Sequence, residues 1–213
     1  MLLDLLLPRR CVACGDAGAL LCTACRAALP ALTPPLCALC GAPVAWPVER
    51  CRECAGRRLA FASARAAVPY DGDVRRLVRR WKEGGLRSLA AVAAEVVVGR
   101  VPPPEADVVT FVPPDVWRAR RRGHHPAEQL AREVAERWQL PCAALLRSTA
   151  VHRQRGLSRI ERQRNPAFCA LTTVPSAVLL DDVYTTGATA NAAAKALGGR
   201  VEVVTFARAV RRA

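Results

Sequence analysis

VLLDDVYTTGAT, residues 178–189, is the stretch of sequence that decides the fold of this chain. Its apolar beginning predicts a strand over residues 177–180 that is covered on both faces, as in a parallel sheet. Asp181 and Asp182 follow at the carboxyl end of this strand, where open α/β sheets bind their ligands. The hydroxyl-rich loop after them leads into a helix predicted at about residues 189–197, and such a loop can surround a phosphate with N–H groups. The stretch therefore predicts an α/β sheet with a sugar-phosphate site at this edge.

A purely structural interpretation of the same residues competes with the binding site. Two acids after a strand often form a turn or a helix cap, and Thr-Thr-Gly-Ala-Thr can be ordinary capping chemistry. Ionised carboxylates accept hydrogen bonds and donate none, which suits the hydroxyl groups of a sugar. We favour the site because the acids and the phosphate-type loop occur together in one short string.

The composition of the chain is strongly basic. It has 213 residues, 52% of them hydrophobic, with 32 basic and 18 acidic side chains and a formal net charge of +14. The length suits one medium domain, or a domain with a small module, and the charge favours anionic partners such as nucleic acid or small phosphate compounds. A GC-rich coding bias explains part of this basic excess, because the chain is rich in arginine and alanine and has only two lysines among 213 residues.

The first residues do not resemble an export signal or a membrane span. Leu2–Leu7 is short, contains Asp4 and lacks a preceding basic region. No stretch reaches the roughly 18 apolar residues that a membrane helix needs. We expect a short amphipathic helix here, no membrane span and a cytoplasmic protein.

Eight of the ten cysteines form four Cys-x-x-Cys pairs near the beginning of the chain: Cys11/Cys14, Cys22/Cys25, Cys37/Cys40 and Cys51/Cys54. Two such pairs complete a tetrahedral four-sulfur site, so eight cysteines predict two structural zinc ions. The ligand sets can follow the sequence order or interleave. A four-sulfur site has no open position for catalysis, which indicates a structural module or a binding surface.

Three other uses of these cysteines compete with zinc. Disulfides require an oxidising compartment, for which the chain shows no export signal. A thioredoxin-like motif needs one Cys-x-x-Cys pair in a βαβ context, not four in a loop-rich stretch. An iron–sulfur cluster remains as a minor alternative.

The rest of the chain alternates between predicted strands and helices. After the basic residues 56–58, the pattern indicates an edge strand at 61–68. A helix capped by Asp73 follows, and its apolar face consists of Val74, Leu77, Val78 and Trp81. Further helices are predicted at 86–98 and 127–139, and further strands at 107–112, 142–146 and 201–206. The βαβ order predicts a largely parallel sheet. Residues 147–168 form a long basic stretch, for which we expect a lid or a disordered loop. We expect His124 and His125 to be loop residues near an anion. Arg208, Arg211 and Arg212 indicate a basic tail.

The order of these motifs resembles the ComF/GntX family. The shared features are the multi-cysteine front, Tyr-Asp-Gly before a helix ending in Trp-Lys, an Arg-Arg-Gly loop, and Leu-Asp-Asp-Val-Tyr-Thr-Thr-Gly-Ala-Thr, which resembles the phosphoribosyl pyrophosphate signature of type I phosphoribosyltransferases. The chain departs from the family at His125 and Pro126, which replace a polar pair. This puts in doubt any contact made by those two side chains.

The resemblance implies a type I phosphoribosyltransferase-like domain at 59–213 behind a double zinc module at 1–58. It implies that Asp181 and Asp182 hold the ribose hydroxyls as the catalytic pair. The implied phosphate loop is Thr185, Thr186, Gly187, Ala188 and Thr189, and the implied pyrophosphate loop is Arg118, Arg120, Arg122 and Gly123.

The resemblance further implies a protein that binds Mg²⁺-phosphoribosyl pyrophosphate or a related ribose 5-phosphate and acts in DNA uptake during natural transformation. Three hypotheses stay open. The first is transfer of phosphoribosyl to a nitrogen acceptor that the sequence does not identify. The second is non-catalytic sensing of phosphoribosyl pyrophosphate or a nucleotide. The third is an accessory that binds single-stranded DNA and the uptake machinery.

Overall fold

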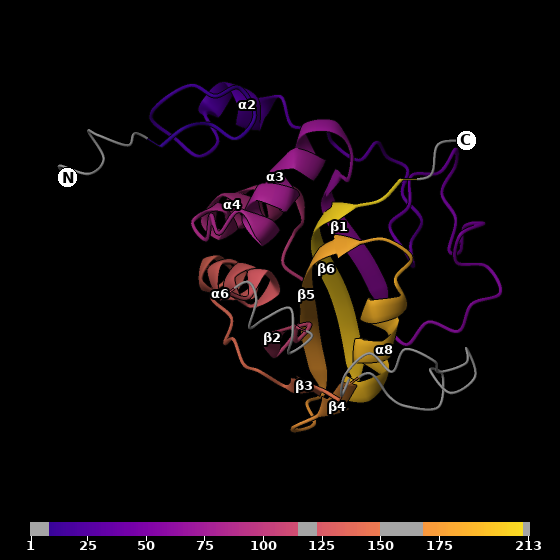
Figure 1. Ribbon diagram of the computed structural model, residues 1–213. Coiled ribbons are helices and arrows are strands. Elements are labelled where there is room, and N and C mark those ends of the chain that lie inside the picture. The colour runs from indigo at the N-terminus through magenta and orange to yellow at the C-terminus, as the bar shows by residue number, and fades with distance from the viewer. Residues whose placement is uncertain (1–8, 115–122, 150–167, 211–213) are drawn as a thin grey trace, which may run out of the picture.

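The computed structural model describes residues 9–114, 123–149 and 168–210 (Figure 1). The regular elements in these ranges follow one another as α2 (Thr23–Ala27), β1 (Ser63–Pro69), α3 (Gly72–Glu83), α4 (Leu89–Arg100), β2 (Val108–Phe111), α6 (Pro126–Trp138), β3 (Leu146–Ser148), β4 (Phe168–Ala170), β5 (Ser176–Tyr184), α8 (Ala188–Leu197) and β6 (Arg200–Arg208). In these ranges no helix is long and apolar enough to cross a membrane.

The main sheet has four strands in the order β1-β6-β5-β2, and every neighbouring pair is parallel. β5 therefore lies inside the sheet, where Leu180 pairs with Val204 of β6. The predicted α/β class, with a mainly parallel sheet flanked by helices and preceded by a cysteine-rich module, is confirmed. β1 is an edge strand, as its position in the sequence predicts.

The sheet lies between two helical layers (Figure 1). Successive side chains of a strand point to opposite faces. Val178 and Leu180 of β5 consequently belong to the core beneath α3, α4 and α6. Ala177 and Leu179 belong to the core beneath α8. Because both faces of β5 are covered, its near-continuous apolar sequence is explained by burial on both sides.

The first helix of the larger layer, α3, forms where the 3.6-residue pattern predicts it. Val74, Leu77, Val78 and Trp81 are all buried, with Trp81 packed edge-on against the ring of Phe206. The predicted helix cap at Asp73 is wrong, because the helix begins at Gly72 and the preceding Asp71 occupies the cap position. A left-handed φ of 39° at Gly72 allows the tight entry into this helix.

Two strand predictions differ from the structure. Residues 142–146 do not join the main sheet as a full strand: Cys142 makes an isolated parallel bridge to Val109, and β3 beyond it pairs antiparallel with β4. β5 continues through Tyr184, so the two acids lie inside the strand and Asp181 pairs with Thr205. Of the predicted lid at 147–168, residues 150–167 lie outside the described ranges, as do Leu2–Leu7 and the tail arginines at 211 and 212.

The cysteine-rich module packs on the α/β part at two places. Its first half lies on α4, where Arg26 forms an ion pair with Glu95 and Arg100 donates hydrogen bonds to the Leu29 carbonyl (2.9 Å) and the Pro30 carbonyl (2.7 Å). Its second half lies along β1, where Ala64 N–H donates to the Leu39 carbonyl at 2.8 Å. The domain boundary between residues 58 and 59 stays a prediction.

Candidate functional site

The eight cysteines of the paired motifs form two separate clusters in sequence order. One consists of Cys11, Cys14, Cys22 and Cys25, and the other of Cys37, Cys40, Cys51 and Cys54. Within each cluster all sulfur atoms lie within 4.8 Å of one another. The interleaved alternative is therefore wrong. The second cluster is completely buried, whereas Cys14 of the first is exposed.

The sulfur geometry of both clusters fits tetrahedral zinc. A Zn–S bond of about 2.3 Å gives a tetrahedron whose edges are about 3.8 Å long. The Sγ–Sγ distances are 3.7 Å between Cys14 and Cys22, and 3.7 Å between Cys37 and Cys54. Backbone N–H groups also point at the sulfurs, as in the bond from Cys51 N–H to Cys37 Sγ at 3.3 Å. The two clusters therefore fit two structural zinc ions.

N–H groups favour the thiolate at one cysteine of each cluster, whereas burial and neighbouring thiols raise the pKa of Cys14, Cys25, Cys40 and Cys54. Burial opposes ionisation of Cys11, but the N–H groups of Cys14 and Cys22 lower its pKa to about 6. Burial likewise opposes ionisation of Cys37, and there the N–H groups of Cys40 and Cys51 contribute to a pKa of about 7. Each cluster thus offers a thiolate near neutral pH, which is the form that binds metal.

We expect about two zinc ions per chain after purification under reducing conditions, because each four-sulfur cluster binds one ion. Elemental analysis of zinc and iron against protein concentration measures this stoichiometry. Iron in place of zinc would support the iron–sulfur alternative. The absence of both metals would refute the metal assignment.

The second candidate site lies at the carboxyl end of β5, where the strand turns into α8. Asp181, Thr185 and Thr189 line a cavity of about 20 Å³, together with Thr205 of β6. Gly187 caps α8 with a left-handed φ of 73°. The first turn of a helix leaves N–H groups without partners inside the helix, and the helix dipole adds positive charge there. This cavity has room for about one water and is too small to hold a phosphate.

The two acids of β5 have different environments. Burial, and then the charge of neighbouring Asp182, raise the pKa of Asp181 well above its ordinary value. Asp182 points to the helical layer instead, where its Oδ2 lies 2.6 Å from Lys82 Nζ at the end of α3. Consecutive strand residues point to opposite faces, which separates the pair. The structure thus places Asp181, but not Asp182, beside the loop cavity.

The end of the arginine-rich loop lies near the end of α3. Arg87 donates a hydrogen bond to the Gly123 carbonyl at 2.6 Å, and the ring Nε2 of His124 lies 2.9 Å from the Trp81 carbonyl. His125 precedes α6, where burial lowers its pKa despite the charge of nearby Glu128. His124 therefore contacts the end of α3, and His125 lies at the start of α6. Arg118, Arg120 and Arg122 lie outside the described residues.

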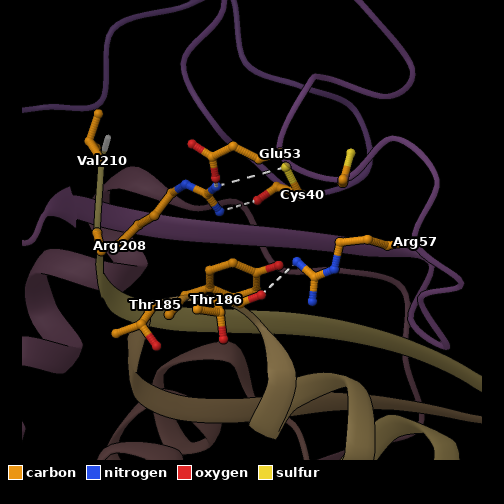
Figure 2. Close-up of a pocket in the computed structure, with 10 residues that line it drawn as sticks. Cys40, Glu53, Arg57, Thr185, Thr186, Arg208 and Val210 are labelled. Carbon is orange, nitrogen blue, oxygen red and sulfur yellow. Dashed lines mark hydrogen bonds and ion pairs between the residues drawn. The ribbon is translucent and has the colours of Figure 1, made fainter. Parts of the chain in front are cut away.

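Sequence reasoning missed two arginines beside the loop, Arg57 at the end of the cysteine-rich module and Arg208 at the end of β6 (Figure 2). Arg57 donates from Nη1 to the Thr186 carbonyl at 2.7 Å. Arg208 is only 1% exposed and its guanidinium lies 4.7 Å above the centre of the Tyr184 ring. Both line a cavity of about 200 Å³ between the second cysteine cluster and the loop. The assignment of Arg208 to a basic tail is wrong, because β6 extends to this residue and buries it.

Comparisons with known proteins agree with the metal clusters. Residues 2–55 match the family described as the Double zinc ribbon domain. A search of the curated proteins found no match. Among solved structures, the chain is similar to an adenine phosphoribosyltransferase from Thermoanaerobacter pseudethanolicus, with a TM-score of 0.35 and 14% identity over 63% of this chain and 74% of that chain. The front of the chain is therefore similar to a double zinc ribbon, in agreement with the sulfur geometry.

Proposed function

We propose that this protein binds Mg²⁺-phosphoribosyl pyrophosphate or a related ribose 5-phosphate at the carboxyl end of β5. One observation carries the proposal: Asp181 and Thr189 line the same cavity beneath the loop that begins α8. A carboxylate for sugar hydroxyls and a helix start for a phosphate are thereby placed within one small ligand's reach.

The 5′-phosphate would rest on Thr185–Thr189, where short hydroxyl side chains and N–H groups donate hydrogen bonds. The ribose hydroxyls would donate to Asp181. A cation at the end of α3, Lys82, lies 2.6 Å from Asp182 on the opposite face of β5. The family resemblance assigns the pyrophosphate to the arginine-rich loop before Gly123, and Mg²⁺ would reduce the charge of the pyrophosphate further.

The further proposal is phosphoribosyl transfer to a nitrogen acceptor. In such a reaction the nitrogen attacks the anomeric carbon of the ribose while the bond to pyrophosphate breaks. The protein would mainly hold the reactants and stabilise the charge of the leaving group, so no protein nucleophile is required. The type I phosphoribosyltransferase resemblance of residues 178–189 supports this reading. The resemblance of the motif order to the ComF/GntX family supports the proposed role in DNA uptake.

Binding of single-stranded DNA is the second candidate, supported by the exposed arginines of α3. The polar face of this helix presents Arg75, Arg76, Arg79 and Arg80. Arg76 forms an ion pair with Asp73, and Arg79 Nε lies 3.4 Å from Glu83 Oε2. These acids reduce the free positive charge of the face, so we place the sugar-phosphate site first.

Isothermal titration calorimetry with Mg²⁺-phosphoribosyl pyrophosphate, ribose 5-phosphate and unphosphorylated ribose tests the proposed site. We expect both phosphorylated ligands to bind and ribose to bind at least about tenfold more weakly, because it lacks the charged group that the helix start attracts. Equal affinity for ribose and ribose 5-phosphate would contradict the phosphate loop. Absence of binding by both phosphorylated ligands would contradict the function.

A screen for pyrophosphate release with nitrogen bases then separates a transferase from a sensor. Titration of single-stranded DNA at several salt concentrations tests the second candidate, since phosphate contacts make the affinity fall steeply with salt.

A further inference from the structure

The second cysteine cluster is joined to the phosphate loop by two contact routes. The first begins at Cys54, whose carbonyl accepts a hydrogen bond from the N–H of Arg57 at 3.2 Å. The guanidinium of Arg57 reaches the Thr186 carbonyl at 2.7 Å. Close by, the N–H of Ala60 donates to Asn191 Oδ1 of α8 at 2.7 Å. The chain that leaves the cluster is thus fixed to both the loop and the helix that follows it.

The second route begins at Cys40 and passes through Arg208 (Figure 2). Arg208 Nη1 donates to the Cys40 carbonyl at 2.5 Å, and Nη2 lies 3.8 Å from Cys40 Sγ. Nη2 also donates to Glu53 Oε2 at 2.6 Å. The guanidinium covers the Tyr184 ring, and a Cβ on Gly187 would lie only 2.2 Å from the Tyr184 hydroxyl. The Tyr184 side chain therefore supports the residue that caps α8.

Both routes connect a metal-binding cysteine to adjacent residues of the loop, Thr186 and Gly187. A bound metal fixes the positions of Cys40 and Cys54, because all four sulfurs must meet one ion. The first cluster has different neighbours, since its contacts run to α4 through Arg26 and Glu95. Both clusters are expected to bind metal, so they differ in what they contact: the second is joined to the phosphate loop and the first to α4.

We infer that the second cysteine cluster, when loaded with zinc, holds the phosphate loop in its ligand-binding conformation, with Arg57 and Arg208 as positioning residues. The identity of the ligand in this inference rests on the proposed function, whereas the coupling of the cluster to the loop does not. Thermodynamic linkage requires that the effect be reciprocal. If zinc raises the affinity of the protein for ribose 5-phosphate by some factor, ribose 5-phosphate must raise the affinity of this cluster for zinc by the same factor.

Substitution of Arg57 tests the first route. We expect Arg57→Ala to weaken ribose 5-phosphate binding about tenfold or more, the effect of one lost hydrogen bond that involves a charged group, and to speed amide hydrogen exchange at residues 185–190. Arg58→Ala is the matched control, because Arg58 is the exposed neighbour and makes no hydrogen bond or ion pair within the described part of the chain. Arg57→Lys retains one donor and should restore part of both effects.

Removal of one ligand from each cluster tests the role of metal. Cys54→Ser and Cys25→Ser should each lower the zinc content to about one ion per chain. Cys54→Ser should speed exchange at residues 185–190, whereas Cys25→Ser should speed it in the segment that packs on α4. A competing chelator, added with and without ribose 5-phosphate, measures the reciprocal effect in the unsubstituted protein.

The outcomes separate the inference from the function on which it rests. If the unsubstituted protein binds no ribose phosphate while Arg57→Ala and Cys54→Ser speed loop exchange, the proposed function fails and the coupling stands. If loop exchange is the same in Arg57→Ala as in Arg58→Ala, and the same in Cys54→Ser as in Cys25→Ser, the inference is overturned.

Discussion

Replacement of Asp181 by asparagine should weaken ribose 5-phosphate binding and, at neutral pH, raise the midpoint of thermal unfolding. Burial and the charge of Asp182 raise the pKa of Asp181 well above its ordinary value. The folded state therefore holds a proton that the unfolded state releases, and stability decreases as the pH rises toward the folded pKa. Asparagine has the same shape without the charge. The stability gain of Asp181→Asn should consequently increase as the pH rises from the ordinary carboxyl pKa to the raised pKa of folded Asp181, and stay constant above it.

The loss of affinity has a separate cause. A hydrogen bond between Asp181 and a sugar hydroxyl contributes about 0.5–1.5 kcal/mol while the carboxyl group holds its proton, and about 1.5–3 kcal/mol once it is ionised. Asp181→Asn should therefore weaken binding by roughly 2- to 10-fold where Asp181 is protonated and by roughly 10- to 100-fold at a pH where it is ionised. Calorimetry gives the affinity and thermal scans give the midpoint. A higher midpoint of thermal unfolding together with weaker ligand binding would indicate that Asp181 serves ligand binding at a cost in stability.

Asp182→Asn is the control for this substitution, because the two acids are adjacent and have opposite expected effects on stability. It leaves the partly buried Lys82 ammonium without its partner and should cost about 2 kcal/mol, less than in a fully buried pair. If Asp181→Asn lowered the midpoint as Asp182→Asn does, Asp181 would be a paired carboxylate in the free protein. The raised pKa and the binding role would then both be wrong.

Replacement of Arg208 by methionine should destabilise the protein by about 3 kcal/mol, because it leaves the Glu53 carboxylate near the second cluster without its cation. Arg208 is almost fully buried and also donates to the Cys40 carbonyl. Methionine retains much of the packing volume, so the loss reports mainly the charge and the hydrogen bonds. Urea unfolding measures the free energy.

Two comparisons make this result specific. Arg200→Met removes an exposed arginine at the other end of β6 that pairs with Glu202, and it should cost less than about 1 kcal/mol. Arg208→Met combined with Glu53→Gln removes both charges and should be more stable than Arg208→Met alone. A loss for Arg208→Met no larger than for Arg200→Met would contradict the structural role of Arg208.

The elements that the sequence predicts best are those with a strong local pattern. The apolar run before Asp181 and the small residues after Gly187 are sufficient to predict β5 and α8, although β5 ends four residues later than expected. The run at residues 142–146 has the same apolar character, but it meets β2 in an isolated bridge between Cys142 and Val109 instead of a full strand. Periodicity indicates burial, and it does not say which neighbour provides that burial.

The arginines show a different limit of sequence reasoning. Arg57 follows a cysteine pair and Arg208 lies near a basic carboxyl-terminal end, so both resemble solvated charges. Their roles depend on partners 129 and 155 positions away, Thr186 and Glu53, which no local pattern connects. Spacing likewise predicts four cysteine pairs but leaves their grouping open, because the grouping depends on how the chain between the pairs folds.

The position of β1 at the edge of the sheet has a consequence for the solubility of the protein. An uncovered edge strand offers free N–H and C=O groups to any other strand and so favours aggregation. Here the turn after Cys37 covers the outer side of β1: the Leu39 carbonyl accepts the N–H of Ala64, and Arg65 donates to the Ala38 carbonyl at 2.9 Å. A cysteine-rich turn thus occupies the outer edge of β1 at its beginning, which leaves less of this edge free for a strand of another copy.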